Sequence, residues 1–117
     1  MPVTDSFLAF VLEQLEPLGP IATKRMFGGV GLYAGDLFFA VAMKDVLYLK
    51  ADDAIRGALE ATGGQPFQPF PDRPRRKGVT QYYSAPPSIL DDRDALLLLA
   101  KQSVAVAARA VGRNGVK

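Results

Sequence analysis

The chain has 117 residues, of which 49% are hydrophobic and 22% charged, and its formal net charge is +2. A chain of this length forms one core, so we expect a single domain over residues 1–117. The absence of Cys and His excludes disulfides, thiol catalysis, and imidazole as a general base or metal ligand. Because the net charge is small, any electrostatic function has to come from local clustering.

A helix is predicted near the N-terminus, where Thr4 or Asp5 can act as its N-cap. The residues that follow place apolar side chains at three- and four-residue spacings, which is typical of an amphipathic helix. Pro17 and then Gly19-Pro20 are predicted to end it.

Strands rich in Val, Leu, Phe and Tyr are predicted next, at about 22–34, 37–43 and 46–50. Turns are expected at Gly35-Asp36 and around Lys44-Asp45. A two-residue turn at Gly35-Asp36 would place Tyr33 opposite Phe38 on one face and Leu32 opposite Phe39 on the other.

The second half of the chain is predicted to contain two helices and two strands. Asp52 is expected to cap a short helix that runs through Ala61 and ends at Gly63-Gly64. The predicted strands are a short edge strand at 67–70 and a strand at 79–84, which is broken by Pro86-Pro87.

The last helix is expected to begin near the acidic residues Asp91, Asp92 and Asp94 and to run to about Val111, with a frayed tail from about 112. The predicted order is α-β-β-β-α-β-β-α. This order indicates an α+β fold of two layers, with helices packed on a mostly antiparallel five-stranded sheet.

Both faces of this sheet are predicted to be apolar. Along the middle strand, strict alternation places one set of side chains on one face (Leu37, Phe39, Val41 and Met43) and a second set on the other (Phe38, Ala40 and Ala42). Helices of the same chain can cover part of each face. Alternatively, one face is the interface of a homodimer or of another protein partner and includes Tyr33 and Phe38. The last helix is also apolar over more than one face, which favours the same two alternatives.

Several short motifs occur in a fixed order along the chain: Arg25-Met26-Phe27-Gly28-Gly29, then Gly31-Leu32-Tyr33, Tyr48-Leu49-Lys50, and Tyr82-Tyr83 followed by Pro86. Together they resemble the N-terminal domain of the TfoX/Sxy family over about residues 5–108. Its members are bacterial proteins known as regulators of natural competence, and the larger ones carry a second, C-terminal domain that has no counterpart here.

The resemblance implies a two-layer α+β fold and a transcription-related role, in some members as a coactivator beside a cAMP-receptor-type protein. We therefore expect a stand-alone regulatory module that acts through protein-protein contacts, as a dimer or with a protein partner, in the bacterial cytoplasm. No membrane contact is expected, because the longest apolar run is too short to span a bilayer.

A cluster of four basic residues lies at Arg73, Arg75, Arg76 and Lys77, with aromatic residues on either side. Basic groups interleaved with aromatic rings suit nucleic acid, which makes direct nucleic-acid binding the alternative function. The simpler interpretation is a solvated loop whose charge keeps an edge hairpin soluble.

No catalytic residue, metal ligand or cofactor-binding residue is predicted. The glycines at Gly28, Gly29 and Gly31 lack a following Gly-Lys-Ser/Thr or helix, so they are interpreted as a bulge or bend in a strand. Carboxylates are expected at helix starts, and no serine has a nucleophile context. A small-ligand site or enzyme near Gly28–Gly31 remains a distant alternative.

Overall fold

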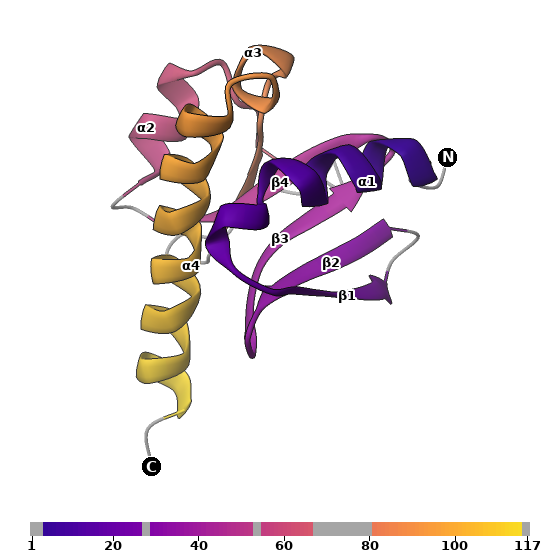
Figure 1. Cartoon of the computed structure of the whole chain (residues 1–117). Coiled ribbons are helices and arrows are strands. Elements are labelled where there is room, and N and C mark those ends of the chain that lie inside the picture. Colours follow the sequence, from indigo (N-terminus) through magenta and orange to yellow (C-terminus); the bar gives the residue numbers. More distant parts are fainter. Residues whose placement is uncertain (1–3, 27–28, 53–54, 67–80, 116–117) are drawn as a thin grey trace.

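Five antiparallel strands form one sheet in which each strand lies beside the next strand along the chain. The computed structural model describes residues 4–26, 29–52, 55–66 and 81–115 (Figure 1). The elements follow in the order α1 (Asp5–Gln14), the 3-10 helix η1 (Glu16–Leu18), β1 (Ile21–Met26), β2 (Gly29–Ala34), β3 (Leu37–Met43), β4 (Val46–Ala51), α2 (Arg56–Ala61), β5 (Gln81–Ser84), α3 (Pro87–Leu90) and α4 (Arg93–Gly115). The predicted α+β class with a five-stranded antiparallel sheet is confirmed.

The predicted strand at 22–34 is in fact two strands, so the expected element order was wrong at this point. β1 and β2 pair antiparallel from Ile21–Ala34 to Met26–Gly29. Gly28 lies outside the described residues. A Cβ at Gly29 would lie 2.5 Å from the Ala42 carbonyl oxygen, so this glycine allows β2 to approach β3 closely. The predicted edge strand at 67–70 also lies outside the described residues.

The hairpin of β2 and β3 contains a bulge that changes which side chains share a face. Tyr33 pairs with Phe38 as predicted, but Leu32 pairs with Ala40, which leaves Phe39 as an extra residue. Phe39 and Ala40 are both fully buried, since both bulge residues oppose the single residue Leu32.

Strict alternation along β3 was therefore the wrong expectation. Beyond the bulge, Val41 and Met43 share the face of Phe38, while Ala40 and Ala42 lie on the face of Phe39. The predicted turn at Lys44-Asp45 has positive φ values of 53° and 58° at its two residues, the backbone of a two-residue hairpin of type I′.

Two of the four described α-helices, α1 and α4, start with a side-chain cap. Thr4 caps α1 through its side-chain oxygen, which accepts a hydrogen bond from the Phe7 backbone N–H. At α4, the Asp92 carboxylate accepts from the Ala95 backbone N–H at 3.2 Å. Asp52 does not cap α2, whose N-cap is Ile55 without a side-chain hydrogen bond. Instead the Asp52 carboxylate pairs with Arg109 of α4 at 2.8 Å.

Two further features of the helices differ from the prediction: an additional short helix and the end of α4. The segment after Pro86 forms the short helix α3, because proline is well suited to the first position of a helix. Helix α4 continues to Gly115, past the end that was expected near Val111. Helix α2 ends as expected, with Gly63 at a φ of +96° and the Gly64 N–H donating to the Leu59 carbonyl oxygen.

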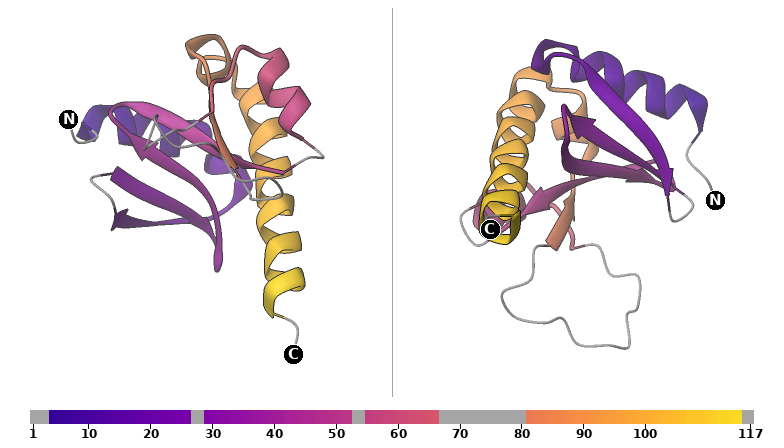
Figure 2. Two further views of the ribbon diagram at one scale, coloured as in Figure 1. Left: turned by 180° about the vertical axis from the view of Figure 1, so that it is seen from behind. Right: turned by 90° about the horizontal axis from the view of Figure 1, so that it is seen from below.

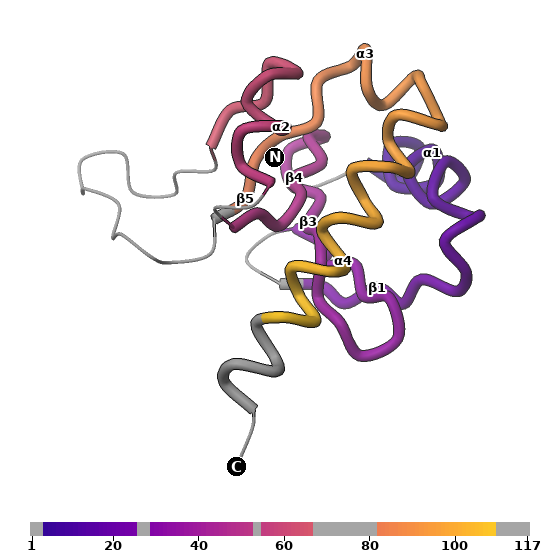
Figure 3. The backbone as a smooth tube through the Cα atoms, turned by 90° about the vertical axis from the view of Figure 1, so that its left-hand side faces the viewer, coloured from indigo at the N-terminus to yellow at the C-terminus, as the bar shows by residue number. Residues whose placement is uncertain are grey.

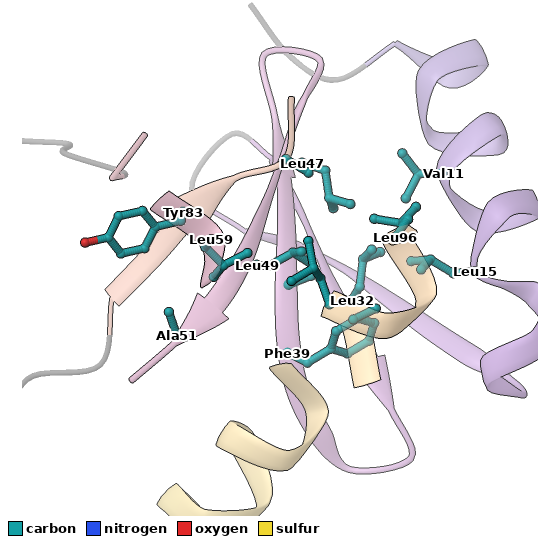
Figure 4. Close-up of a cluster of buried hydrophobic side chains, with 14 of the residues drawn as sticks. Val11, Leu15, Leu32, Phe39, Leu47, Leu49, Ala51, Leu59, Tyr83 and Leu96 are labelled. Carbon is teal, nitrogen blue, oxygen red and sulfur yellow. The ribbon is translucent and has the colours of Figure 1, made fainter. Parts of the chain in front are cut away.

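The core lies between one face of the sheet and the helices, mainly α4, which packs on β3 and β4 (Figure 3). In the right-hand view of Figure 2, α1 and α4 lie along two sides of the curled sheet. Figure 4 shows side chains of this core, which include Val11, Leu15, Leu32, Phe39, Leu47, Leu49, Leu59, Tyr83 and Leu96. The described helices thus bury only one of the two sheet faces.

Candidate functional site

The second face of the sheet, called the open face from here on, has no helix packed on it within the described part of the chain. Strand pairing assigns its side chains. They are Ala22 and Lys24 in β1, Gly29, Gly31 and Tyr33 in β2, Phe38, Val41 and Met43 in β3, Val46, Tyr48 and Lys50 in β4, and Tyr82 and Ser84 in β5. Val41 is 6% exposed but does not belong to the main core cluster, which agrees with its place on this face.

Three aromatic rings from different strands meet on the open face, and they are called the aromatic row below. The centre of the Phe38 ring lies 5.1 Å from that of Tyr33 and 5.8 Å from that of Tyr82. All three side chains are half-buried. Aromatic pairs at these separations attract one another beyond the area they bury, so the row holds its shape without a helix above it.

Lys50 packs against the same row. Its ammonium lies 5.5 Å from the centre of the Phe38 ring, within the range of a cation–π interaction. The ammonium also donates a hydrogen bond to the Phe38 carbonyl oxygen at 3.3 Å. Burial lowers the pKa of Lys50 from its ordinary value of 10.5, because a charged amine loses solvation there.

Tyr82 shows the apolar character of the row most clearly. Burial, with a smaller contribution from the neighbouring Tyr33, raises the pKa of Tyr82 from 10.0 to about 12. The phenolate is disfavoured because this site offers little water to solvate it. The hydroxyl therefore stays protonated at all physiological pH values, and it is unsuited to act as a base.

A shallow depression lies beside the aromatic row, at the edge formed by β1. It measures about 350 Å³ and is lined by Ala22, Thr23, Lys24, Tyr33, Gly35 and Asp36. Tyr33 pairs with Phe38 of β3 on one side and with Ala22 of β1 on the other. On the β1 side, Tyr33 faces the methyl group of Ala22, and the Lys24 side chain also lines the depression.

Within the glycine-rich segment, the space around Gly29 is filled. A Cβ at Gly29 would meet the Ala42 carbonyl oxygen and the Met43 side chain. The element that follows is a strand, whereas phosphate loops lead into a helix. Across the described ranges, no group of three or more His, Cys, Asp or Glu side chains is arranged to hold a metal ion.

Of the predicted interface residues, Tyr33 and Phe38 both lie on the open face and contact each other. The basic residues Arg73, Arg75, Arg76 and Lys77 lie outside the described residues. No described helix is both long and apolar enough to cross a membrane.

The residues of the family motifs divide between the two faces. Six of them lie on the open face: Gly29, Gly31, Tyr33, Tyr48, Lys50 and Tyr82. Leu49 and Tyr83 lie in the core. The others are Arg25, which is exposed on β1, Met26 at the end of β1, Pro86 at the start of α3, and Phe27 and Gly28, which are not among the described residues.

The sequence alone did not predict that Lys50 and Tyr82 lie on the same sheet face as Tyr33 and Phe38. Adjacent residues of a strand point to opposite faces, and of Tyr82 and Tyr83 it is Tyr83 that is buried, at 1% exposure. No local signal pairs β5 with β4, since this contact joins residues at least thirty positions apart.

The structure defines a small two-layer α+β domain whose uncovered sheet face carries an aromatic row. The chain belongs to the TfoX N-terminal domain family, because the model of that family matches residues 13–107. This span runs from within α1 to within α4 and covers most of the chain. No curated protein matches the chain.

Proposed function

We propose that this TfoX N-terminal domain is a non-enzymatic regulatory module that acts through protein contacts and associates with a second copy of itself through the open face. The observation that carries the proposal is the aromatic row of Tyr33, Phe38 and Tyr82, half-buried on a face without a described helix. Apolar patches that remain at the surface of a folded domain tend to mark interaction sites.

A role in transcription or competence-type regulation is the finer part of the proposal, and family membership is its support. A contact surface fits such a role because a regulator can act by binding other proteins without any chemistry of its own. The titratable side chains of the open face in the described strands are Lys and Tyr, without a carboxylate.

The test of self-association compares two apolar surface residues. Sedimentation velocity at micromolar concentration is expected to show a dimer, and Phe38→Lys is expected to shift it to monomer by placing two charges in the contact. Leu98→Lys is the control, because Leu98 is 60% exposed on α4, away from the open face. A protein that stays monomeric, or a Phe38→Lys variant that stays dimeric, contradicts self-association through this face.

The regulatory role needs a separate measurement in the source cells. Phe38→Lys at the native locus is expected to change transcript levels in the same direction as deletion of the gene, whereas Leu98→Lys leaves them unchanged. A Phe38→Lys strain with normal transcripts, in which the variant protein is present at its usual level, contradicts regulation through the open face.

Direct nucleic-acid binding by the cluster Arg73–Lys77 remains a separate prediction from the sequence. Such binding would weaken steeply as salt rises, and replacing Arg75, Arg76 and Lys77 by Ala would reduce the salt slope. Failure to retain DNA or RNA at low salt would contradict it.

A further inference from the structure

The depression beside Tyr33 extends the aromatic row by one more ring-sized place. Rings of Tyr82, Phe38 and Tyr33 follow one another across β5, β3 and β2. The next strand, β1, contributes Ala22 opposite Tyr33. The depression is lined by Tyr33 and Ala22 together with polar residues of β1 and of the turn, and the small Ala22 side chain leaves room beside the Tyr33 ring.

The size and shape of this space suit a flat aromatic group. Its volume of about 350 Å³ lies at the small end of the range found for ligand sites. A planar ring that enters it would stack on Tyr33 from the side opposite Phe38. Stacking on an aromatic side chain is the main way in which proteins hold unpaired nucleobases.

The polar groups at the rim distinguish a nucleobase from an apolar ring. Lys24 lines the depression and is exposed, so its ammonium is available to a phosphate group. Asp36 lines the other end, where its carboxylate can accept from an exocyclic amino group. An aromatic side chain from a protein would leave both of these groups without a complementary partner.

The charge of the whole open face points to the same ligand. Its described strand positions include Lys24 and Lys50 and no carboxylate, and Asp36 in the turn is the acidic residue at its rim. A positive sheet face with aromatic rings is complementary to a single strand, whose phosphates carry negative charge and whose bases are free to stack.

We propose that the open face binds single-stranded nucleic acid, with one base stacked on Tyr33 in the depression beside β1 and the adjoining phosphate at Lys24. A duplex cannot bind in this way, because its bases are already stacked and paired. The base site uses the β1 side of Tyr33, a ring that also belongs to the aromatic row on which self-association is proposed, so a strand and a second copy would compete for it.

Fluorescence anisotropy with labelled oligo-dC and oligo-C of about ten nucleotides, a length within the usual footprint of such sites, tests the proposal, because cytosine carries the exocyclic amino group that Asp36 can accept from. Both strands are expected to bind the full chain at low salt, and a duplex of the same length to bind at least about 10-fold more weakly. Tyr33→Ala is expected to lower the affinity by about 10-fold, whereas Tyr33→Phe, which keeps the ring, stays within about twofold of the parent.

Two further variants separate stacking from charge. Lys24→Ala is expected to reduce the slope of log affinity against log salt by about 0.7, the value for one phosphate contact on a single strand. Leu98→Ala on α4 is the matched control and should leave the affinity unchanged. Circular dichroism confirms that each variant is folded.

Several results overturn the proposal. They are no binding of either oligonucleotide at low salt, equal binding of duplex and single strand, and equal affinity of Tyr33→Ala and the parent. If no oligonucleotide binds and Tyr33→Ala abolishes self-association, the depression holds a ring of the second copy instead. A monomeric chain that binds oligonucleotides through Tyr33 contradicts self-association and leaves this proposal standing.

Discussion

The two faces of the sheet differ in chemistry although the same five strands form both. Toward the helices the strands carry mainly aliphatic side chains, such as Leu32, Leu47 and Leu49, which are fully buried. Toward the open face they carry Tyr33 and Phe38 with Tyr82, which are half-buried, and two lysines. The first set packs against other elements, whereas the second packs largely within itself.

This difference shows how a small domain keeps an apolar surface without a helix to cover it. Aromatic rings bury part of one another. Lys50 covers part of Phe38 with its long side chain. The remaining exposed area is what a partner can bury, so substitutions should affect stability on one face and association on the other.

The largest expected effect comes from the neighbouring residues Phe39 and Phe38, which point to opposite faces. Phe39→Ala should lower the free energy of unfolding by about 3–5 kcal/mol, because it leaves a cavity in the core. Phe38→Ala should cost about 1–2 kcal/mol, because the ring is half-buried and loses its ring partners. Urea denaturation measures both, and equal costs would contradict the assignment of the two faces.

A smaller effect is expected at Gly29, where β2 passes close to β3. Gly29→Ala would place a Cβ 2.5 Å from the Ala42 carbonyl oxygen, and overpacking of this kind costs about 1–3 kcal/mol. Gly57→Ala in α2 is the control, since nothing lies within 4 Å of its Cβ position. It should stabilise the helix by about 0.5–1 kcal/mol. If both variants shift the midpoint in the same direction, close packing at Gly29 is wrong.

The adjacent tyrosines of β5 give a second matched pair. The Tyr83 hydroxyl donates to a Glu60 carboxylate oxygen at 3.0 Å on the covered side of the sheet. Tyr83→Phe removes that hydrogen bond and should cost about 1 kcal/mol at neutral pH. Tyr82→Phe should change little under the same conditions, and a larger loss from Tyr82→Phe would reverse the comparison.

Tyr82 should matter at alkaline pH instead. Its pKa is 10.0 when unfolded and about 12 in the folded domain. The unfolded chain therefore loses this proton first, and the contribution of Tyr82 to stability is complete below pH 10 and falls as pH rises toward 12. Tyr82→Phe should remove this fall, measured as the difference from the parent in denaturation midpoint across that range. A difference that does not change with pH contradicts the raised pKa.

The smallest expected effect is that of the ion pair between Arg109 and Asp52, which joins α4 to the end of β4 at 2.8 Å. The Arg109 side chain is 45% exposed, and exposed pairs of this kind contribute about 0.2–1 kcal/mol. Arg109→Ala should lower the unfolding free energy by that amount at low salt and by less at high salt. A cost above that range would show that α4 depends on this contact.

Much of the local structure was predictable because its signals are local. Thr4 and Asp92 have side chains that accept hydrogen bonds from the first turn of a helix, and both cap as expected. The turn at Gly35-Asp36 set the pairing of Tyr33 with Phe38. These residues act within a few positions of their own place in the chain, so the sequence pattern carries the information.

The errors occurred where distant strands decide the outcome. The residues around Gly28-Gly29 suit a strand on both sides, so sequence reasoning joined β1 and β2 into one strand. The bulge at Phe39 is defined by the pairing of β3 with β2, and no residue type in β3 predicts it. Asp52 was expected to cap a helix, but its carboxylate accepts hydrogen bonds from Arg109, which lies 57 positions further along the chain.

The sequence by itself determined the fold class, the family, and which residues are buried and which form turns. These follow from periodicity, capping and ordered motifs. Only the tertiary structure decided which face each residue of β3 occupies and that Tyr33, Phe38, Lys50 and Tyr82 form one surface. The physical reason is that a sheet joins residues by pairing across strands, and a single bulge reverses the side on which every later residue of the strand lies.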